Sequence, residues 1–268
     1  MYFQSVNGQQ VNHISVNDRG LAYGDGIFTT AKVSNGQIEL IHQHINRLKM
    51  GCCLFKILDV DFIALENELI ECCKTYDLAV LKVVITSGEG GRGYSRVGVS
   101  RPNIIIKVSE FPTKYLHWSQ SGITVADATI KLGINPLFSG VKHLNRLEQV
   151  LIRDELDQTN YDDLLVFNIF DEVIETTCAN VFWFDNGELF TPEIKNSGVA
   201  GLQRSEVLRK YPATQVIKAK AADIQRAQSM FITNSIMGIV PIINYAGNKL
   251  NIDQVHQFKA LIANINSC

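Results

Sequence analysis

The spacing of the apolar residues changes twice along the chain, and this change constrains the fold more than any other feature. Residues 6–40 alternate short apolar runs with turn residues, including two Asn-Gly pairs, which is typical of hairpin strands. From Ile41 the apolar residues recur at helical spacing, and a second helix is predicted over roughly 61–76. Two β-rich runs follow, at 80–86 and 103–109. Strands, then helices, then strands favour an α+β layer over alternating βαβ units.

The second half of the chain repeats the mixture of strands and helices. A strand is predicted at 123–128, the clearest helical spacing in the chain follows Leu144, and strand patterns resume at 164–169. We therefore expect three parts, which are a small α+β domain over residues 1–112, a linker over 113–121 and a larger domain over 122–268.

Composition excludes several classes of protein. Charged residues make up 19% of the 268 and the formal net charge is −2, so neither nucleic acid nor an anionic membrane is expected as a partner. No apolar run approaches the ~20 residues of a membrane helix, and the N-terminus lacks the regions of a signal peptide.

The cysteines predict no metal site. Neither doublet, Cys52-Cys53 nor Cys72-Cys73, has the two-residue spacer of a zinc knuckle or a redox dithiol. Both doublets fall within helical spacing, which favours buried free thiols. Free thiols indicate a reducing compartment, most simply the cytoplasm.

Lys142 is the leading candidate for chemistry. It stands where a loop that starts at Gly140 gives way to the predicted helix. A lone lysine in such a turn is more often a solvated surface charge. At a helix entrance, however, the positive end of the dipole and partial burial would favour the neutral amine that a nucleophile requires. The assignment therefore depends on partners elsewhere in the chain.

Four other features are candidate partners, and three of them have a plainer alternative. Glu175 lies in an apolar run, either as a buried acid or on the solvent face of an edge strand. Arg47 lies off the apolar face of its helix, toward an anion or toward water. Gly201 directly precedes a helix, which favours an anion site. The polar triplet at 233–235 is either a turn or a second place for a phosphate.

The glycine-rich segment at 88–93 matches G-x-G-x-x-G, but it does not predict a dinucleotide site. That motif requires a helix after the third glycine, whereas residues 95–102 show no helical spacing and end in proline. A mobile loop that displays Arg92 and Tyr94 is the preferred interpretation, with a plain linker loop as the alternative.

Together these segments resemble the fold-type IV enzymes that use pyridoxal phosphate (PLP), over nearly the whole chain. The similarity is carried by residues 23–30, 44–48, 90–95, 140–149, 175–180 and 201–204. The Lys-His-Leu-Asn-Arg-Leu block that begins at Lys142 and the Gly-Gly-Arg-Gly-Tyr-Ser block that begins at Gly90 are typical of the family's lyases. The segments at Glu175 and Gly201 are shared with its aminotransferases.

The resemblance implies a role for each matching residue. Lys142 would bind the cofactor aldehyde as a Schiff base, and Glu175 would pair with the pyridine nitrogen. The phosphate would be held by the Arg47 side chain, by the backbone N–H groups of Leu202 and Gln203, and by Ser235.

The resemblance also implies residues that act on the substrate. Aminotransferases of the family commonly have glutamate at the position of Thr29, so Thr29-Thr30 is a lyase-like departure, with Thr30 as a proton shuttle. Arg92, with Tyr94, would meet a substrate carboxylate.

The implied reaction is the conversion of 4-amino-4-deoxychorismate to 4-aminobenzoate and pyruvate, a step of folate biosynthesis. Either Lys142 or Thr30 would protonate the released enolpyruvyl group. The implied architecture is a homodimer whose subunits have a small α+β lobe and a larger lobe with a β-barrel-like core. An aminotransferase for D-amino acids or branched-chain amino acids is the alternative, because it would share Lys142, Glu175 and the phosphate site.

Overall fold

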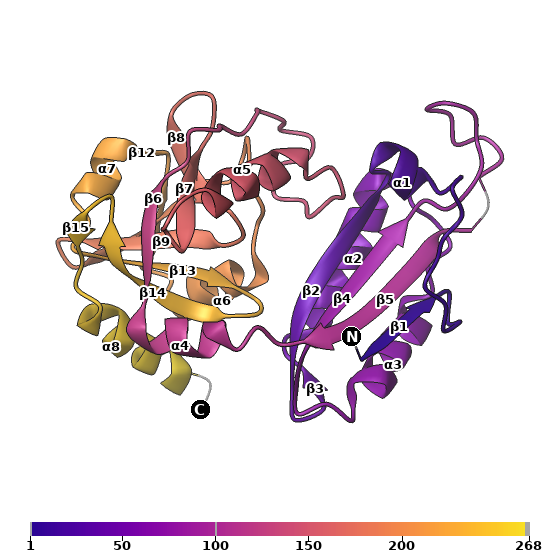
Figure 1. Cartoon of the computed structure of the whole chain (residues 1–268), viewed down its shortest axis with the longest axis horizontal. Helices are drawn as coiled ribbons and strands as arrows, with labels where there is room; N and C mark the ends of the chain where they lie inside the picture. The colour runs from indigo at the N-terminus through magenta and orange to yellow at the C-terminus, as the bar shows by residue number, and fades with distance from the viewer. Residues whose placement is uncertain (1, 100, 266–268) are drawn as a thin grey trace. The chain divides into compact units, whose positions relative to one another are not determined.

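The computed structural model describes residues 2–99 and 101–265 and divides into two compact units (Figure 1). The first unit comprises Met1–Pro112 together with Val141–Asn145, and the second comprises Thr113–Gly140 and Arg146–Cys268. The chain thus leaves the second unit after Gly140 and returns at Arg146. Nothing in the sequence pattern predicted this excursion.

The first unit is built on an antiparallel sheet with strand order β1-β5-β4-β2-β3. Its elements in chain order are β1 (Phe3–Val6), α1 (Arg19–Tyr23), β2 (Gly26–Ser34), β3 (Gln37–Ile38), α2 (Ile41–Phe55), α3 (Phe62–Cys73), β4 (Leu78–Thr86) and β5 (Asn103–Glu110). The predicted helices and β-rich runs are therefore confirmed, because each carried a strong apolar period.

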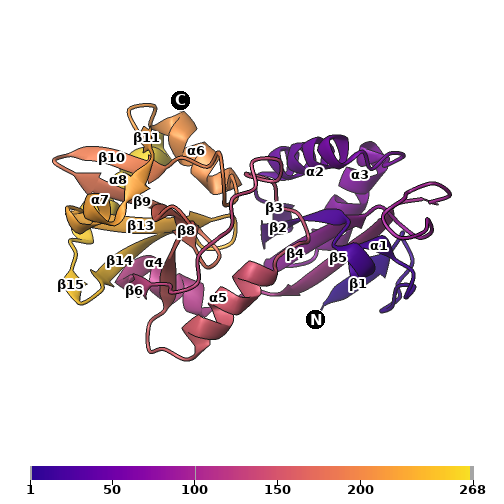
Figure 2. The same ribbon diagram turned by 90° about the horizontal axis from the view of Figure 1, so that it is seen from above.

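Alternation along β2 explains how this sheet is covered. Ile27, Ala31 and Val33 are buried and belong to the same apolar cluster as Ile45 and Leu48 of α2. Figure 2 shows α2 and α3 on the same face of the sheet. The intervening residues of β2 point to the other face. One face of β2 therefore packs against α2 and α3, and the other face is not covered by these helices.

The second unit contains a larger mixed sheet with strand order β11-β10-β9-β13-β14-β6-β7-β8-β12, and β15 pairs with β14. Its elements are α4 (Lys114–Ser121), β6 (Ile123–Asp127), α5 (Leu147–Asp157), β7 (Asp163–Phe167), β8 (Glu172–Thr176), β9 (Asn180–Asp185), β10 (Glu188–Pro192), α6 (Leu202–Lys210), β11 (Gln215–Ile217), β12 (Ala219–Lys220), α7 (Ala221–Gln225), β13 (Ser229–Asn234), β14 (Gly238–Tyr245), β15 (Asn248–Lys249) and α8 (Asp253–Asn264).

This sheet curls back on itself. Its two outermost strands are β11, which ends at Ile217, and β12, which begins at Ala219, so a single residue joins opposite edges. Neighbouring residues of β9 face two different clusters. Val181 and Trp183 pack with the strands of one face, whereas Phe182 packs with residues of α6 and α8. The expected barrel-like core is therefore confirmed, with both faces of the sheet buried.

Two segments differ from the sequence-based expectation. Residues 113–121, expected to be a linker, form helix α4, because Tyr115 and Trp118 pack against a core cluster of the second unit. Helix α5 begins at Leu147, later than expected, and its buried side chains are Ile152 and Leu156. Its other apolar residues remain exposed.

The thiols divide between core and surface. Cys52 and Cys73 are buried, whereas Cys53 and Cys178 are exposed, so the expected burial applies to one member of each doublet. Within residues 2–99 and 101–265, no helix combines the length and apolar character needed to cross a bilayer.

Candidate functional site

Lys142 does not stand at a helix entrance, and that prediction was wrong. Its carbonyl oxygen accepts a hydrogen bond from the backbone N–H of Phe28 (2.9 Å), and His143 pairs with Ile27 in an antiparallel bridge. The N–H of Leu144 also donates to the carbonyl of Gly26 (3.0 Å). The segment 141–145 therefore extends the edge of the first sheet beside β2.

The amine of Lys142 lies over an aromatic ring. Its Nζ atom is 4.5 Å from the centroid of the Phe28 ring, and the Nζ atom of Lys82 is 5.2 Å from the same centroid. Thr30 is half-buried and lies directly opposite Lys82, which in turn lies opposite Lys107. The two amines and the Thr30 hydroxyl therefore belong to the face of the sheet that α2 and α3 do not cover.

Lys82 was missed by the sequence reasoning. Burial lowers the pKa of Lys82, and the positive charge of Lys107 lowers it further. Lys82 is exposed in the middle of an apolar strand, so its residue type gave only a weak signal. Only the strand register shows that it faces Thr30.

The opposite face of β2 carries a buried polar pair. Thr29 and His44 are each 2% exposed, and the Thr29 hydroxyl is 2.6 Å from Nδ1 of His44. Arg47 lies one helical turn after His44, and burial lowers its pKa to about 10. Among the described residues, Nε2 of His44 has no hydrogen-bonding partner.

In the second unit, Glu175 is a buried acid, so the edge-strand alternative is wrong. It lies in β8 between β7 and β12, is 6% exposed, and its Oε2 atom accepts a hydrogen bond from the N–H of Val199 (2.9 Å). A Cβ atom at Gly198 would lie 3.3 Å from Glu175 Oε2 and 2.5 Å from Ile174 Cγ2. Gly198 also has a φ of +86°, so the close approach requires glycine.

A cationic side chain lies near this acid. Burial lowers the pKa of Arg146, and the negative charges of Glu175 and Glu148 oppose that effect. Arg146 therefore places a positive charge near the carboxylate of Glu175.

Gly201 directly precedes α6, as expected, and the anion site predicted there stays a prediction. No side chain caps the helix, and its first turn contains the N–H groups of Leu202 and Gln203. The N–H of Gly201 donates to Oδ1 of Asn180 (3.1 Å), and Nδ2 of Asn180 donates to the carbonyl of Val199 (2.9 Å). Asn180 thus fixes the entry to the helix.

Ser235 begins the turn between β13 and β14. The turn is held by Oδ1 of Asn234, which accepts hydrogen bonds from the N–H groups of Ile236 and Met237. Thr233 lies directly opposite Asn180 in the sheet. The strand end with Ser235 and the start of α6 are therefore both tied to Asn180.

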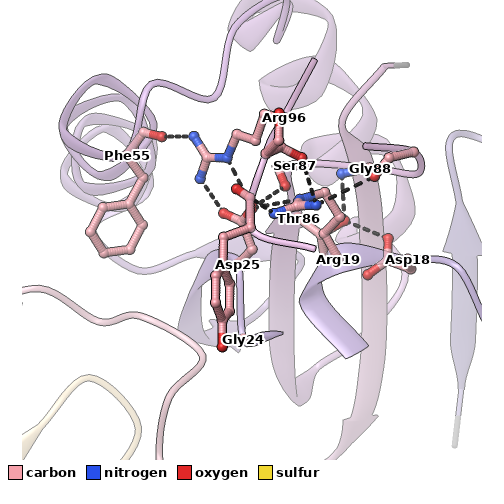
Figure 3. Close-up of polar contacts among 12 residues, drawn as sticks. Asp18, Arg19, Gly24, Asp25, Phe55, Thr86, Ser87, Gly88 and Arg96 are labelled. Carbon is pink, nitrogen blue, oxygen red and sulfur yellow. Dashed lines mark hydrogen bonds and ion pairs between the residues drawn. The ribbon is translucent and has the colours of Figure 1, made fainter. Parts of the chain in front are cut away.

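The glycine loop, defined here as residues 88–95, contains no helix, in agreement with the rejection of a dinucleotide motif. Arg92 and Tyr94 are exposed. Arg19 binds the loop through several of its carbonyl oxygens, and Figure 3 shows the ion pairs around Asp25 at its base. The expected mobility of the loop stays a prediction. Burial raises the pKa of Asp25, but hydrogen bonds from Arg96, Ser87 and Arg19 outweigh burial, so the pKa lies below its ordinary value.

The predicted site residues thus fall into two groups. The first unit contains Lys142, Thr30, Arg47 and the loop residues Arg92 and Tyr94. The second contains Glu175, Leu202, Gln203 and Ser235. Across the part of the chain that the structure describes, no group of three or more His, Cys, Asp or Glu side chains could hold a metal ion.

Comparison with known proteins defines the class. Residues 26–245 match the family model for class IV amino-transferases. The chain therefore belongs to the class IV aminotransferase family.

Particular members of that family are similar along the whole chain. Aminodeoxychorismate lyase of Vibrio harveyi is 35% identical over 252 residues, which cover 92% of this chain and 93% of the relative. The crystal structure of 4-amino-4-deoxychorismate lyase from Pseudomonas aeruginosa has a TM-score of 0.89 and 32% identity, with 96% of this chain and 97% of that chain covered. A D-alanine aminotransferase of Staphylococcus aureus is 24% identical over 92% of this chain and 90% of the relative.

Proposed function

We propose that this chain is a PLP-dependent lyase that converts 4-amino-4-deoxychorismate to 4-aminobenzoate and pyruvate. The observation that carries the proposal is the pairing of Thr30 with Lys82 on the sheet face where Lys142 lies over Phe28. A hydroxyl and an additional cation beside the reactive amine suit elimination from a substrate with two carboxylates. The 35% identity to a lyase of this specificity supports the same conclusion.

The donor groups fit PLP. Glu175 is buried and oriented by the N–H of Val199, as required of an acid that keeps a ring nitrogen protonated. The first turn of α6 has no side-chain cap, and a Cβ atom at Gly201 would lie 2.0 Å from Oδ1 of Asn180. This glycine-dependent cradle suits a phosphate. Arg47 and Ser235 would add a cationic and a hydroxyl donor.

The substrate carboxylates require positive charge. Lys82 and Lys107 are neighbours across β4 and β5, on the same sheet face as Thr30. We assign one carboxylate to Lys82. Arg92, with Tyr94, is assigned to the other, because both are exposed on the glycine loop and a guanidinium binds a carboxylate as a fork.

The chemistry follows from these positions. When bound, the cofactor supplies an aldehyde for the substrate amine and a protonated ring that takes up negative charge. Lys142 removes the proton from the ring carbon that bears the nitrogen, and Glu175 keeps the ring nitrogen protonated. The carbon–oxygen bond to the enolpyruvyl group then breaks as the six-membered ring becomes aromatic. Lys142 or Thr30 gives a proton to the released group, which becomes pyruvate.

The decisive experiment measures both products. Purified protein with 4-amino-4-deoxychorismate should release pyruvate and 4-aminobenzoate in equal amounts, whereas Lys142→Ala should release neither. Thr30→Val should slow pyruvate release, with Thr29→Val as the matched control on the other face of β2. Absence of both products from folded, PLP-loaded protein would reject the lyase assignment.

The alternative is an aminotransferase, favoured by the similarity to D-alanine aminotransferases. It would use Lys142 and Glu175 in the same way, so those residues do not discriminate. Protein incubated with D-alanine and 2-oxoglutarate should show no glutamate formation if the lyase assignment is right. Fast transamination without pyruvate release from 4-amino-4-deoxychorismate would establish the alternative.

The proposal includes a homodimer. On α5, Leu147 is 70% exposed and Val150 is 60% exposed, an apolar face that a second copy of the chain would cover. Light scattering should give a dimer for wild-type protein and a monomer for the Leu147→Lys, Val150→Lys variant. Leu261→Lys, at an exposed position of α8, is the matched control and should remain dimeric. An unchanged mass for the α5 variant would reject this surface.

A cytoplasmic location is also proposed, supported by the free thiols of both cysteine doublets. Fractionation of the source cells should recover the protein with cytoplasmic markers, and recovery from a secreted fraction would contradict it.

A further inference from the structure

Arg19 is the centre of the contacts that hold the glycine loop. It lies in α1, is 4% exposed, and its Nε atom donates to Oδ2 of Asp25 (3.0 Å). Its terminal nitrogens donate to the carbonyl oxygens of Gly90 (3.4 Å), Gly93 (3.0 Å), Tyr94 (3.3 Å) and Ser95 (3.1 Å). A single buried guanidinium therefore binds the backbone of the loop at several points.

Asp25 closes the base of the loop. Ser87, directly before the loop, donates its hydroxyl to Oδ2 of Asp25 (2.7 Å). Arg96, directly after the loop, donates its Nε to the same oxygen (2.9 Å) and binds Oδ1 through a terminal nitrogen. Arg96 also donates to the carbonyl of Phe55 at the end of α2. Figure 3 shows these side chains converging on the one carboxylate, and we call Asp25, Arg19, Ser87 and Arg96 the clasp.

The clasp is separate from the bonds that hold Lys142. Gly24 accepts a hydrogen bond at its carbonyl from the side chain of Asn145 (3.1 Å). Gly26 and Phe28 bond to the segment of Lys142 through their backbones. None of these bonds involves the carboxylate of Asp25. Removing that carboxylate should therefore loosen the loop without releasing the segment of Lys142.

We propose that Asp25 is a positioning residue that sets substrate affinity, because it closes the loop that displays Arg92 and Tyr94. The inference rests on the proposed function, in which those two residues meet a substrate carboxylate. The side chains of Arg19 and Asp25 are 5% and 10% exposed, whereas Arg92 and Tyr94 are exposed, so the clasp would act through the loop and not by contact with substrate. A loop that is ordered in advance loses less conformational entropy when substrate binds. The clasp therefore acts on KM, while Lys142 and Thr30 determine kcat.

The test compares exchange and kinetics in the PLP-loaded enzyme. Asp25→Asn removes the charge that both guanidinium groups share. Arg96→Met opens the base of the loop at a side chain that is 35% exposed. This second variant should therefore destabilise the fold less than Asp25→Asn. Arg101→Met is the matched control, because Arg101 is an exposed arginine just beyond the loop. Amide hydrogen exchange is measured over residues 88–95, and initial rates are measured against 4-amino-4-deoxychorismate.

Both clasp variants should exchange the loop amides at least about tenfold faster. KM should rise about tenfold, the factor that corresponds to ~1.4 kcal/mol, with kcat within about threefold of wild type. PLP affinity and absorbance should be unchanged, and the Arg101 variant should match wild type. Unchanged exchange, or faster exchange with unchanged KM, would overturn the proposal. So would a loss of kcat and PLP affinity together, which marks a general loss of structure.

Failure of the proposed function gives a different result. If wild-type protein releases no pyruvate, the lyase assignment fails, and the KM comparison is made with D-alanine and 2-oxoglutarate. The exchange comparison does not depend on the substrate. A positioning role then requires that the clasp variants show both a higher KM for the accepted substrate and faster amide exchange in the loop than wild type.

Discussion

The buried imidazole of His44 makes the stability of the first unit depend on pH. Burial lowers the pKa of His44 to about 3, and the positive charges of Arg47 and Lys142 contribute to the shift. The ordinary value is 6.5. Well above pH 6.5 neither the folded nor the unfolded chain binds a proton at this ring. As the pH falls toward 3, the unfolded chain takes up a proton that the folded chain does not, so stability is lost.

The size of the effect follows from the two pKa values. Between pH 8 and pH 5 the unfolded state should gain about 2 kcal/mol from protonation of His44, and each further pH unit should add about 1.4 kcal/mol until the pH nears 3. Because His44 is 2% exposed, solvent screens its charged form very little, and the full shift in pKa contributes to the free energy of unfolding. A loss of 2 kcal/mol is a large part of the stability of an ordinary domain.

The measurement is urea unfolding at pH 5 and pH 8, for wild-type protein and His44→Gln. Trp118 and Trp183 both lie in the second unit, so far-UV circular dichroism is required alongside tryptophan fluorescence. The variant should have a lower free energy of unfolding than wild type at pH 8. At pH 5 the difference between the two proteins should be smaller by about 2 kcal/mol. The difference between the proteins cancels the titration of the other histidines. An equal difference at both pH values would refute the neutral buried imidazole.

Three further predictions test other parts of the structure. Glu175→Gln should retain the bond from Val199 but lower kcat on the order of 10²-fold with little change in PLP affinity, as measured by turnover and absorbance titration. Gly201→Ala should destabilise the protein by about 1–3 kcal/mol and weaken PLP binding, because the new methyl group would meet Oδ1 of Asn180. Thermal melting and PLP titration should show both losses together. Asp61→Ala should cost about 1 kcal/mol without a change in kcat, because its side chain caps the first turn of α3, and urea unfolding with a turnover control measures this.

Periodic elements could be predicted from the sequence because their signals are local. Helix α2 begins at Ile41, where the apolar spacing changes, and Asp61 caps α3 at the expected place. The segment of Lys142 could not be predicted in this way. Its structure depends on a strand far away in the chain, since Asn145 contacts Gly24, 121 positions earlier. Helical spacing after Leu144 predicted a helix that begins too early. The backbone of Leu144 is hydrogen-bonded to β2, so α5 begins only at Leu147.

Residue types predicted the burial of Glu175 better than they predicted the supporting contacts elsewhere. Glu175 stood out because an acid in an apolar run needs a partner, and the structure provides Val199. Arg19 gave no such signal, because an arginine beside a turn is ordinarily solvated, yet it is buried against the glycine loop. Lys82 gave a weak signal that only the register with Thr30 makes meaningful. Contacts between distant strands carry information that spacing along one strand does not contain.

The two adjacent threonines of β2 illustrate why that register matters for the reaction. Successive residues of a strand face opposite sides, so Thr29 bonds His44 in the core while Thr30 faces Lys82. Of the two threonines, only Thr30 therefore lies on the sheet face of Lys142, as the proposed proton donor requires. A glutamate at position 29 would put a carboxylate against the imidazole and favour its protonated form. Threonine adds no charge beside the neutral imidazole. The two threonines thus occupy separate environments, one in the core under α2 and one on the open face of the sheet.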